Sequence, residues 1–131
     1  MEYTNILSEH WGKKIVGVVC DYPNGFADEL VLILEDGTSI KFYHRQDCCE
    51  CVCIEDIDID PQELVGSVLV SMEEAYNQEF DDRDESQTWT FYKIQTNNTC
   101  ATIRWWGSSN GYYSESVHIS VTHASDVDDE D

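Results

Sequence analysis

The sequence predicts a mainly β protein of the α+β class, folded as a single compact domain of about seven or eight antiparallel strands with one or two short helical pieces. Short runs rich in Val, Ile and aromatic residues recur along the chain. Turn residues separate these runs at a spacing typical of an antiparallel sheet that packs on itself. No internal repeat or linker divides the 131 residues, and a hydrophobic fraction of 41% is enough for one modest core.

The first half of the chain contains three predicted strands. Residues 14–20 (KIVGVVC) are a short Val-rich run, followed by dense turn residues. Residues 29–35 (ELVLILE) have no polar interruption, so we expect this strand to be buried on both faces. An Asp-Gly hairpin signal then leads to a third strand at 38–44 (TSIKFYH). Alternation in that strand places three side chains on one face: Ile40, Phe42 and His44.

Residues 61–106 are predicted to contain a helical turn, a strand, a loop and a hairpin. A proline at a helix start predicts one turn over about 61–65, and residues 67–76 are interpreted mainly as strand. Residues 79–86 (EFDDRDES) are expected to form a charged loop. The β-branched and aromatic residues of 88–96 and 101–106 flank an Asn-rich turn, which predicts a hairpin.

The C-terminal part is predicted to contain one more strand. Residues 107–111 (GSSNG) are typical of a loop, and alternation over 117–122 indicates a half-exposed final strand. We expect a globular domain over 1–124 and a disordered acidic tail over 125–131, because the tail has nothing to bury.

The charge of the chain is strongly unbalanced. Asp and Glu number 27 against 7 Lys and Arg, which gives a net charge of −20 and a pI near 4.1. This charge repels phosphates, so we do not expect direct binding of DNA or RNA. Basic proteins are the natural partners, and an acidic surface would speed their encounter. The alternative is that the charge serves solubility alone.

The chain carries no sign of a membrane or secretory segment. No apolar stretch approaches the roughly 20 residues that span a bilayer, and the first residues lack the pattern of a signal peptide. We therefore expect a protein of the cytoplasm, where thiols stay reduced and clustered cysteines are more often metal ligands than disulfides.

The segment 44–53 (HRQDCCECVC) is the strongest candidate site, because it contains four of the six cysteines and a histidine. Zinc takes thiolate and imidazole ligands in a tetrahedron. The histidine ends a strand on its apolar face, and the cysteines that follow are close enough for the backbone to turn back over the imidazole. The spacing is not that of a standard zinc finger. The segment predicts a structural zinc with four ligands: His44, Cys48, Cys49 and Cys51.

Two other interpretations of this segment remain open. Cysteines also behave as small buried hydrophobic residues, and a histidine can simply end a strand. A Cys–His nucleophile is a further alternative, but the acids nearby would raise a thiol pKa rather than lower it. We expect Cys53 to be a bystander and the other three histidines to lie at the surface: His10, His118 and His123.

Acidic and aromatic residues outside this segment are candidates for binding a partner. Alternation in residues 55–60 (EDIDID) puts acids on one side and isoleucines on the other, and more acids follow in the charged loop. Two tyrosines after the 107–111 loop suit a protein interface. The predicted partner-binding residues are Glu55, Asp56, Asp58, Asp60, Glu79, Asp81, Asp82, Tyr112 and Tyr113.

Four stretches of the chain resemble a known family: FYHRQDCCECVCIEDI, ELVGS, SQTWTFYKI and TIRWWGSSNGYYSESV. They are similar to small proteins encoded by phages and mobile elements of bacteria, known mainly as a domain of unknown function. The resemblance covers residues 14–122. Cys51 and Cys53 depart from the family's usual pattern, which favours His44, Cys48 and Cys49 as ligands.

A small, acidic, phage-type metalloprotein also resembles the anti-CRISPR proteins that inhibit Cas9, by analogy of size, charge and setting. Cas9 holds its guide–target duplex in a positively charged channel, on which an acidic domain could dock and block DNA loading. The sequence therefore suggests a zinc-stabilised, non-enzymatic inhibitor of Cas9 in the host bacterial cytoplasm. The alternatives are a small metal- or thiol-dependent phage enzyme, and a phage accessory or structural module with a structural zinc.

Overall fold

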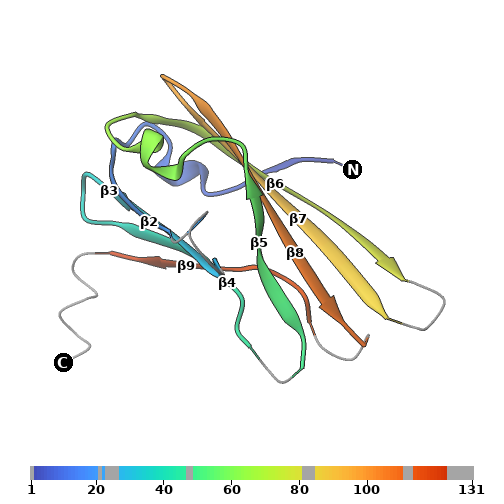
Figure 1. The fold of residues 1–131 in the computed structure, drawn as a ribbon. Helices are drawn as coiled ribbons and strands as arrows, with labels where there is room; N and C mark the ends of the chain where they lie inside the picture. Colours follow the sequence, from blue (N-terminus) through green and yellow to red (C-terminus); the bar gives the residue numbers. More distant parts are fainter. Residues whose placement is uncertain are drawn as a thin grey trace, which may run out of the picture.

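Two antiparallel sheets face each other across the hydrophobic core, as Figure 1 shows. The computed structural model describes residues 2–20, 22, 27–46, 49–80, 85–110 and 114–123. One sheet contains, in spatial order, β1 (Thr4–Asn5), β6 (Leu69–Phe80), β7 (Ser86–Thr96), β8 (Cys100–Ser109) and β5 (Cys51–Ile57). The other contains β2 (Ile15–Cys20), β3 (Glu29–Leu34), β4 (Ser39–Tyr43) and β9 (His118–Thr122). The predicted fold class, a single mainly β domain of antiparallel strands with short helical pieces, is confirmed.

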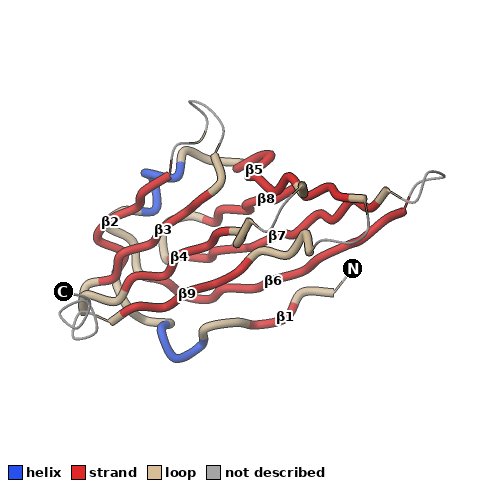
Figure 2. The backbone as a smooth tube through the Cα atoms, turned by 90° about the horizontal axis from the view of Figure 1, so that it is seen from below, coloured by secondary structure: helices blue, strands red, loops and turns tan. Residues whose placement is uncertain are grey.

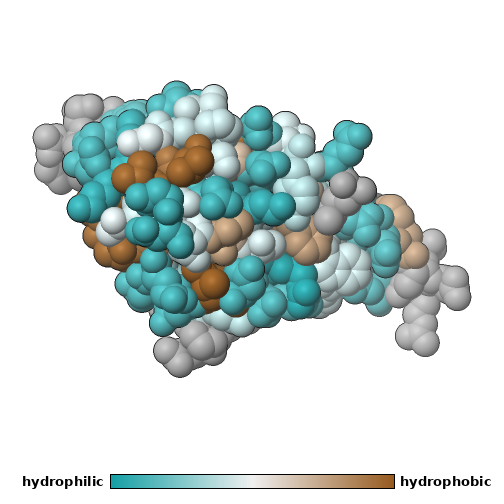
Figure 3. All heavy atoms as spheres, turned by 90° about the horizontal axis from the view of Figure 1, so that it is seen from above, coloured by the Kyte–Doolittle hydropathy of each residue, from teal (hydrophilic) through white to brown (hydrophobic). Residues whose placement is uncertain are grey.

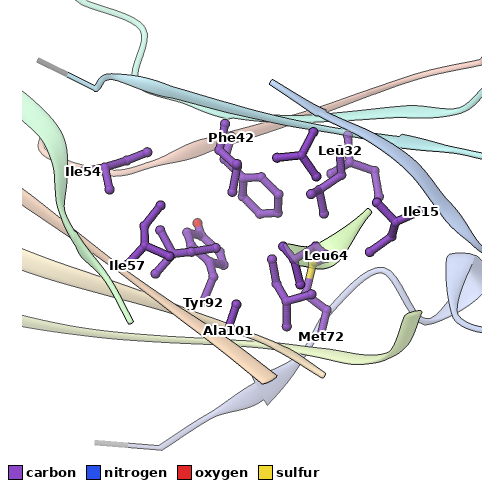
Figure 4. Packing of buried hydrophobic residues seen from close by; sticks show 14 of the residues in the cluster. Ile15, Leu32, Phe42, Ile54, Ile57, Leu64, Met72, Tyr92 and Ala101 are labelled. Atoms are coloured by element: carbon purple, nitrogen blue, oxygen red, sulfur yellow. The ribbon is translucent and has the colours of Figure 1, made fainter. Parts of the chain in front are cut away.

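The core is formed by the alternate side chains that each sheet turns toward the other (Figure 4). Phe42 of β4 and Tyr92 of β7 meet there, with their ring centroids 4.8 Å apart. Burial of a large apolar side chain stabilises a fold by about 1.5–3 kcal/mol, so the contact between the sheets is the main source of stability. Ile40 and Phe42 are fully buried on the face where alternation placed them.

The prediction that residues 29–35 are buried on both faces is wrong. Leu30, Leu32 and Leu34 are buried, whereas Val31 and Ile33 are half-buried on the outer face. The apolar run reflects the position of β3 between β2 and β4, where neighbouring side chains shield the outer face in part.

Three strands of the larger sheet are much longer than the strands that they face. β6, β7 and β8 have 12, 11 and 10 residues, whereas β2, β3, β4 and β9 have five or six. The long strands therefore run on beyond the end of the smaller sheet, which Figures 1 and 2 both show. We call this extension, formed by residues 76–80, 86–90 and 105–109, the overhang. Its inner face is covered by the smaller sheet only in part and holds the site described below.

Two predicted loops are in fact partly strand. Glu79 and Phe80 continue β6, where they pair with Gln87 and Ser86 of β7. Residues 107–109 continue β8, and Gly107 pairs with Thr88. Both stretches are polar or contain glycine, which is typical of a loop, but an exposed end of a sheet tolerates such residues once the strands are paired. Several predicted features lie outside the described residues: Cys48, Asp81, Asp82, Tyr112, Tyr113 and the tail over 125–131.

Short helical pieces close the domain at the other end. The helical turn predicted at 61–65 is η2 (Pro61–Leu64), and Asp60 caps it by accepting a hydrogen bond from the backbone N–H of Gln62 at 3.0 Å. A second turn, η1 (Ser8–His10), was not predicted. Among the described residues, no helix is long and apolar enough to cross a membrane.

Candidate functional site

His44 and Glu50 form a buried pair at the end of β4. His44 Nε2 lies 2.7 Å from Glu50 Oε2, and the two side chains are 3% and 0% exposed. His44 Nδ1 donates to the backbone carbonyl of Ser116 at 2.7 Å. Because Nδ1 faces a carbonyl, it must carry a proton, and a further proton lies between Nε2 and the carboxyl group. The pair therefore ties residues 44–50 to a segment 72 positions further along the chain.

Gln46 completes this buried polar group. Its amide nitrogen donates to the Glu50 carbonyl at 2.6 Å and lies 3.3 Å from Glu50 Oε1. A buried carboxyl group is costly unless its oxygens are bonded, and His44 and Gln46 both meet that need. The sequence pattern placed His44 on the apolar face correctly, but it gave no sign that the Glu50 carboxyl group would meet the ring.

The structure places the predicted zinc ligands in different settings. Both ring nitrogens of His44 already contact oxygen atoms. Cys49 is disulfide-bonded, although the composition favoured reduced thiols, and Cys51 is an exposed free thiol at the start of β5. Cys48 lies outside the described residues. Within the described part of the chain, no three His, Cys, Asp or Glu side chains are grouped so as to hold a metal. Zinc at this segment stays a prediction.

Cys53 is not an activated nucleophile. Burial raises the pKa of its thiol, and the neighbouring Cys51, Glu55 and Asp28 raise that pKa further. The thiol is therefore protonated at neutral pH, as the acidic sequence around it predicted. This disfavours a thiol-dependent enzyme that would use Cys53.

A second buried acid, Glu115, anchors the segment 114–117 to the inner face of the overhang. Its Oε1 accepts hydrogen bonds from Thr88 Oγ1 at 2.7 Å and from Ser86 Oγ at 3.1 Å. Its Oε2 accepts a short hydrogen bond from Ser109. Sequence reasoning missed this acid. The inward positions 86, 88 and 109 are all hydroxyl residues, which is the signal that could have revealed a polar interior there.

Gly107 makes room for this acid. A Cβ added at position 107 would lie 2.9 Å from Glu115 Cβ and 3.1 Å from Val52 Cγ2. A side chain at this point of β8 would therefore push segment 114–117 off the sheet.

A pocket of about 330 Å³ lies between this segment and the overhang. β6 contributes Glu74, Tyr76 and Gln78 to its lining, and β7 contributes Thr88 and Thr90. Glu115 and its neighbours in 114–117 form the remaining side. The pocket is polar and acidic, and it is large enough for a side chain or a small ligand.

The opposite, outer face of the long strands holds a shallow groove with aromatic walls. Trp89 and Phe91 line it together with Arg104, and two predicted partner-binding acids, Glu55 and Glu79, lie at its side. Arg104 Nε is 2.6 Å from Glu55 Oε1, but its N–H does not point at that oxygen, so the contact is a charge pair without a hydrogen bond. The structure thus brings Glu55 and Glu79 together.

Three other predicted acids have partners inside the described part of the molecule. Asp56 accepts a hydrogen bond from the Tyr22 hydroxyl at 2.9 Å, and Asp58 accepts one from the Thr102 backbone at 2.8 Å. Asp60 is the cap of η2. Asp58 and Asp60 are exposed while Ile57 is buried, as the alternation indicated. These three acids have structural roles beside any contact with a partner.

His10 is buried rather than at the surface as expected. Lys13 Nζ lies 3.0 Å from His10 Nδ1, and Glu9 lies 3.8 Å from Nε2. Burial lowers the pKa of His10 below its ordinary 6.5, and Lys13 and His123 lower it further, against the opposite influence of Glu9 and Asp36. His10 is therefore held neutral.

This histidine makes stability depend on pH. The unfolded chain binds a proton at His10 more readily than the folded chain does, so the contribution of His10 is complete above pH 6.5 and is lost as the pH falls below that value. We expect the urea midpoint to fall between about pH 7.5 and about pH 5.5, and His10→Gln to make that fall smaller. An identical fall in the wild-type protein and the variant would contradict this role of His10.

The fold and the site define a small, acidic β-sandwich. It has a hydrophobic core and two buried carboxyl groups, those of Glu50 and Glu115. The chain belongs to the DUF7448 family, a domain of unknown function, which matches residues 8–119. The resemblance to a domain of unknown function is thereby confirmed. No curated protein and no solved structure matches the chain.

Proposed function

We propose that this protein is a non-enzymatic interaction domain that binds a basic, nucleic-acid-binding surface of another protein and blocks it. Cas9 of a bacterial host is the partner we propose, in the manner of a phage-encoded anti-CRISPR protein. The observation that carries the proposal is the net charge of −20, the excess of 27 acids over 7 Lys and Arg.

The ion pairs of the described residues leave most of this charge unpaired. Three cations have carboxylate partners: Lys13 with Asp36, Lys41 with Glu29, and Arg104 with Glu55. The chain has 27 acids against 7 Lys and Arg, so ion pairs can neutralise only a minority of the acids. The face seen in Figure 3 is accordingly mostly hydrophilic, with small and separate apolar patches. A surface of this kind attracts a basic partner over about a Debye length, roughly 10 Å at 0.1 M salt.

The outer groove supplies a specific place for docking. Glu79 is exposed and has no ion-pair partner among the described residues, and Trp89 and Phe91 lie beside it, half-exposed. Aromatic faces next to carboxylates attract guanidinium and ammonium groups by cation–π and charge interactions together. Basic channels that hold nucleic acid are rich in these groups.

Charge reversal tests the groove. Glu79→Lys is expected to weaken binding to guide-free Cas9 about tenfold or more, measured by interferometry with immobilised protein. Glu9→Lys is the matched control, because it changes the net charge equally but lies on η1, outside the groove. Equal weakening by both variants would show that charge acts without a docking site. Absence of binding by the wild-type protein would remove Cas9 as the partner.

The proposal includes a structural zinc in the reduced protein, held by His44, Cys48, Cys49 and Cys51. For this, His44 must exchange one of its oxygen contacts for the metal, and Cys49 must leave its disulfide. Zinc binds thiolates, so binding requires the reduced state. We expect a chelator to lower the melting temperature of the reduced protein by about 5 °C or more and to leave the oxidised protein unchanged. Reduced protein without zinc, and with an unchanged melting temperature, would show that the zinc prediction is wrong.

A further inference from the structure

The pocket beneath the overhang is acidic and has no positive charge in its lining. Two of its lining residues, Glu74 and Glu115, carry carboxyl groups, and none of the lining residues that the structure describes is Lys or Arg. Glu115 is buried, and its oxygens accept hydrogen bonds from three hydroxyl groups. It therefore adds an acidic group to the lining without being exposed to solvent. Glu74 is half-buried and nearer to solvent.

Glu74 keeps an acceptor for a ligand. Its Oε2 accepts a hydrogen bond from the Tyr92 hydroxyl at 2.7 Å, while its Oε1 has no hydrogen-bond partner among the described residues. Burial raises the pKa of Tyr92, and the bond to Glu74 raises it further, so the tyrosine keeps its proton and stays a donor. As far as the described residues go, the second oxygen is open to a donor that enters the pocket.

An exposed aromatic ring lies next to this carboxylate. Tyr76 follows Glu74 on the inner face of β6 and is 70% exposed, although it is one of the lining residues. Phe80, two positions beyond Gln78 on the same face, is 66% exposed. Aromatic side chains so exposed next to a cavity are typical of binding surfaces.

We propose that this pocket binds the guanidinium group of an arginine side chain presented by the basic partner. The group is planar, carries five N–H donors and stacks on aromatic faces, which suits one open carboxylate oxygen, the amide oxygen of Gln78 and the ring of Tyr76. A lysine ammonium group would satisfy the charge but not the stacking. The inference rests on the proposed function and adds a second contact, on the face of the β6–β7 hairpin opposite the outer groove.

A titration of the full chain without any partner protein tests the pocket directly. The probe is arginine blocked at both ends, followed by chemical shifts of the backbone amides, with blocked citrulline as the uncharged analogue of the same shape. We expect the blocked arginine to shift resonances of β6, β7 and residues 114–117, and citrulline to bind about tenfold more weakly. Glu74→Gln should weaken the arginine about tenfold and Tyr76→Ala about threefold, while Glu9→Gln on η1, outside both the pocket and the outer groove, should leave it unchanged.

Three results would overturn the proposal. One is equal binding of arginine and citrulline. Another is equal weakening by Glu74→Gln and Glu9→Gln, which would reveal general attraction to an acidic surface. The last is a preference of about tenfold or more for agmatine, a free guanidinium compound, which would assign the pocket to a small free cation. Because no partner protein is present, failure here is distinct from failure to bind Cas9.

Discussion

Replacing His44 with alanine is expected to destabilise the protein by about 3–5 kcal/mol, because it leaves the Glu50 carboxyl group buried without its main partner. The change also removes the bond from His44 Nδ1 to the Ser116 carbonyl, which holds segment 114–117 against the end of β4. Urea unfolding at neutral pH, followed by tryptophan fluorescence, measures the loss.

A double variant distinguishes the interaction between His44 and Glu50 from the other effects of each replacement. When Glu50 is also replaced by alanine, no buried acid of this pair is left without its partner. The double variant should therefore lose less free energy of unfolding than the two single variants lose together. His123→Ala is the control for loss of a histidine at the surface, and it should cost about 1 kcal/mol or less, because His123 contacts Thr38 at 3.3 Å and lies beside the ring of His10. A cost of that size for His44→Ala would contradict the buried pair.

Replacing Glu115 with alanine is expected to cost about 3 kcal/mol, because three hydroxyl groups lose their shared acceptor and a small cavity opens. The same unfolding measurement applies. Glu79→Ala, which removes an exposed acid of β6, is the matched control and should change stability by about 0.5 kcal/mol or less. Equal effects of the two replacements would show that Glu115 does not anchor its segment.

Gly107→Ala tests the same contact between Glu115 and the overhang by adding a methyl group on β8. Its Cβ would meet Glu115 Cβ at 2.9 Å, and overpacking of this kind costs about 1–3 kcal/mol. Gly17→Ala offers the comparison, because its nearest neighbour is the end of the Ile33 side chain at 3.3 Å, which can move.

Periodicity and turn residues were sufficient to predict most of the fold. The strands at 14–20, 29–35 and 38–44, and the hairpin around residues 97–99, all follow from local patterns. The ends of the long strands could not be predicted, because they carry polar residues such as Glu79 and Ser108, which alone are typical of a loop. What makes them strands is pairing with neighbours, and pairing is not a local property.

The candidate site was even harder to predict from local sequence patterns than the strand ends were. Alternation placed His44 on the apolar face, but the atom that its Nδ1 meets belongs to Ser116, 72 positions away. Glu50 was seen only as one more acid beside the cysteines. Glu115 had no local signal of burial, since its partners come from β7 and β8. Contacts of this range depend on how the two sheets pack.

The two buried acids give segment 114–117 a clear role. Glu115 fastens it to the overhang and Ser116 fastens it to His44, so the segment forms a fixed wall for the acidic pocket. The contact surfaces proposed for a basic partner, the pocket and the outer groove, are therefore on the two faces of the overhang.

The affinity for guide-free Cas9 as a function of salt is the measurement that tests the central claim most directly. An acidic domain that docks on a basic channel should bind at about 0.05 M salt and lose affinity steeply, by about tenfold or more, as salt rises to about 0.5 M. Guide and target nucleic acid should compete with it for the same surface. Absence of binding at low salt, or an affinity that does not change with salt, would contradict the account.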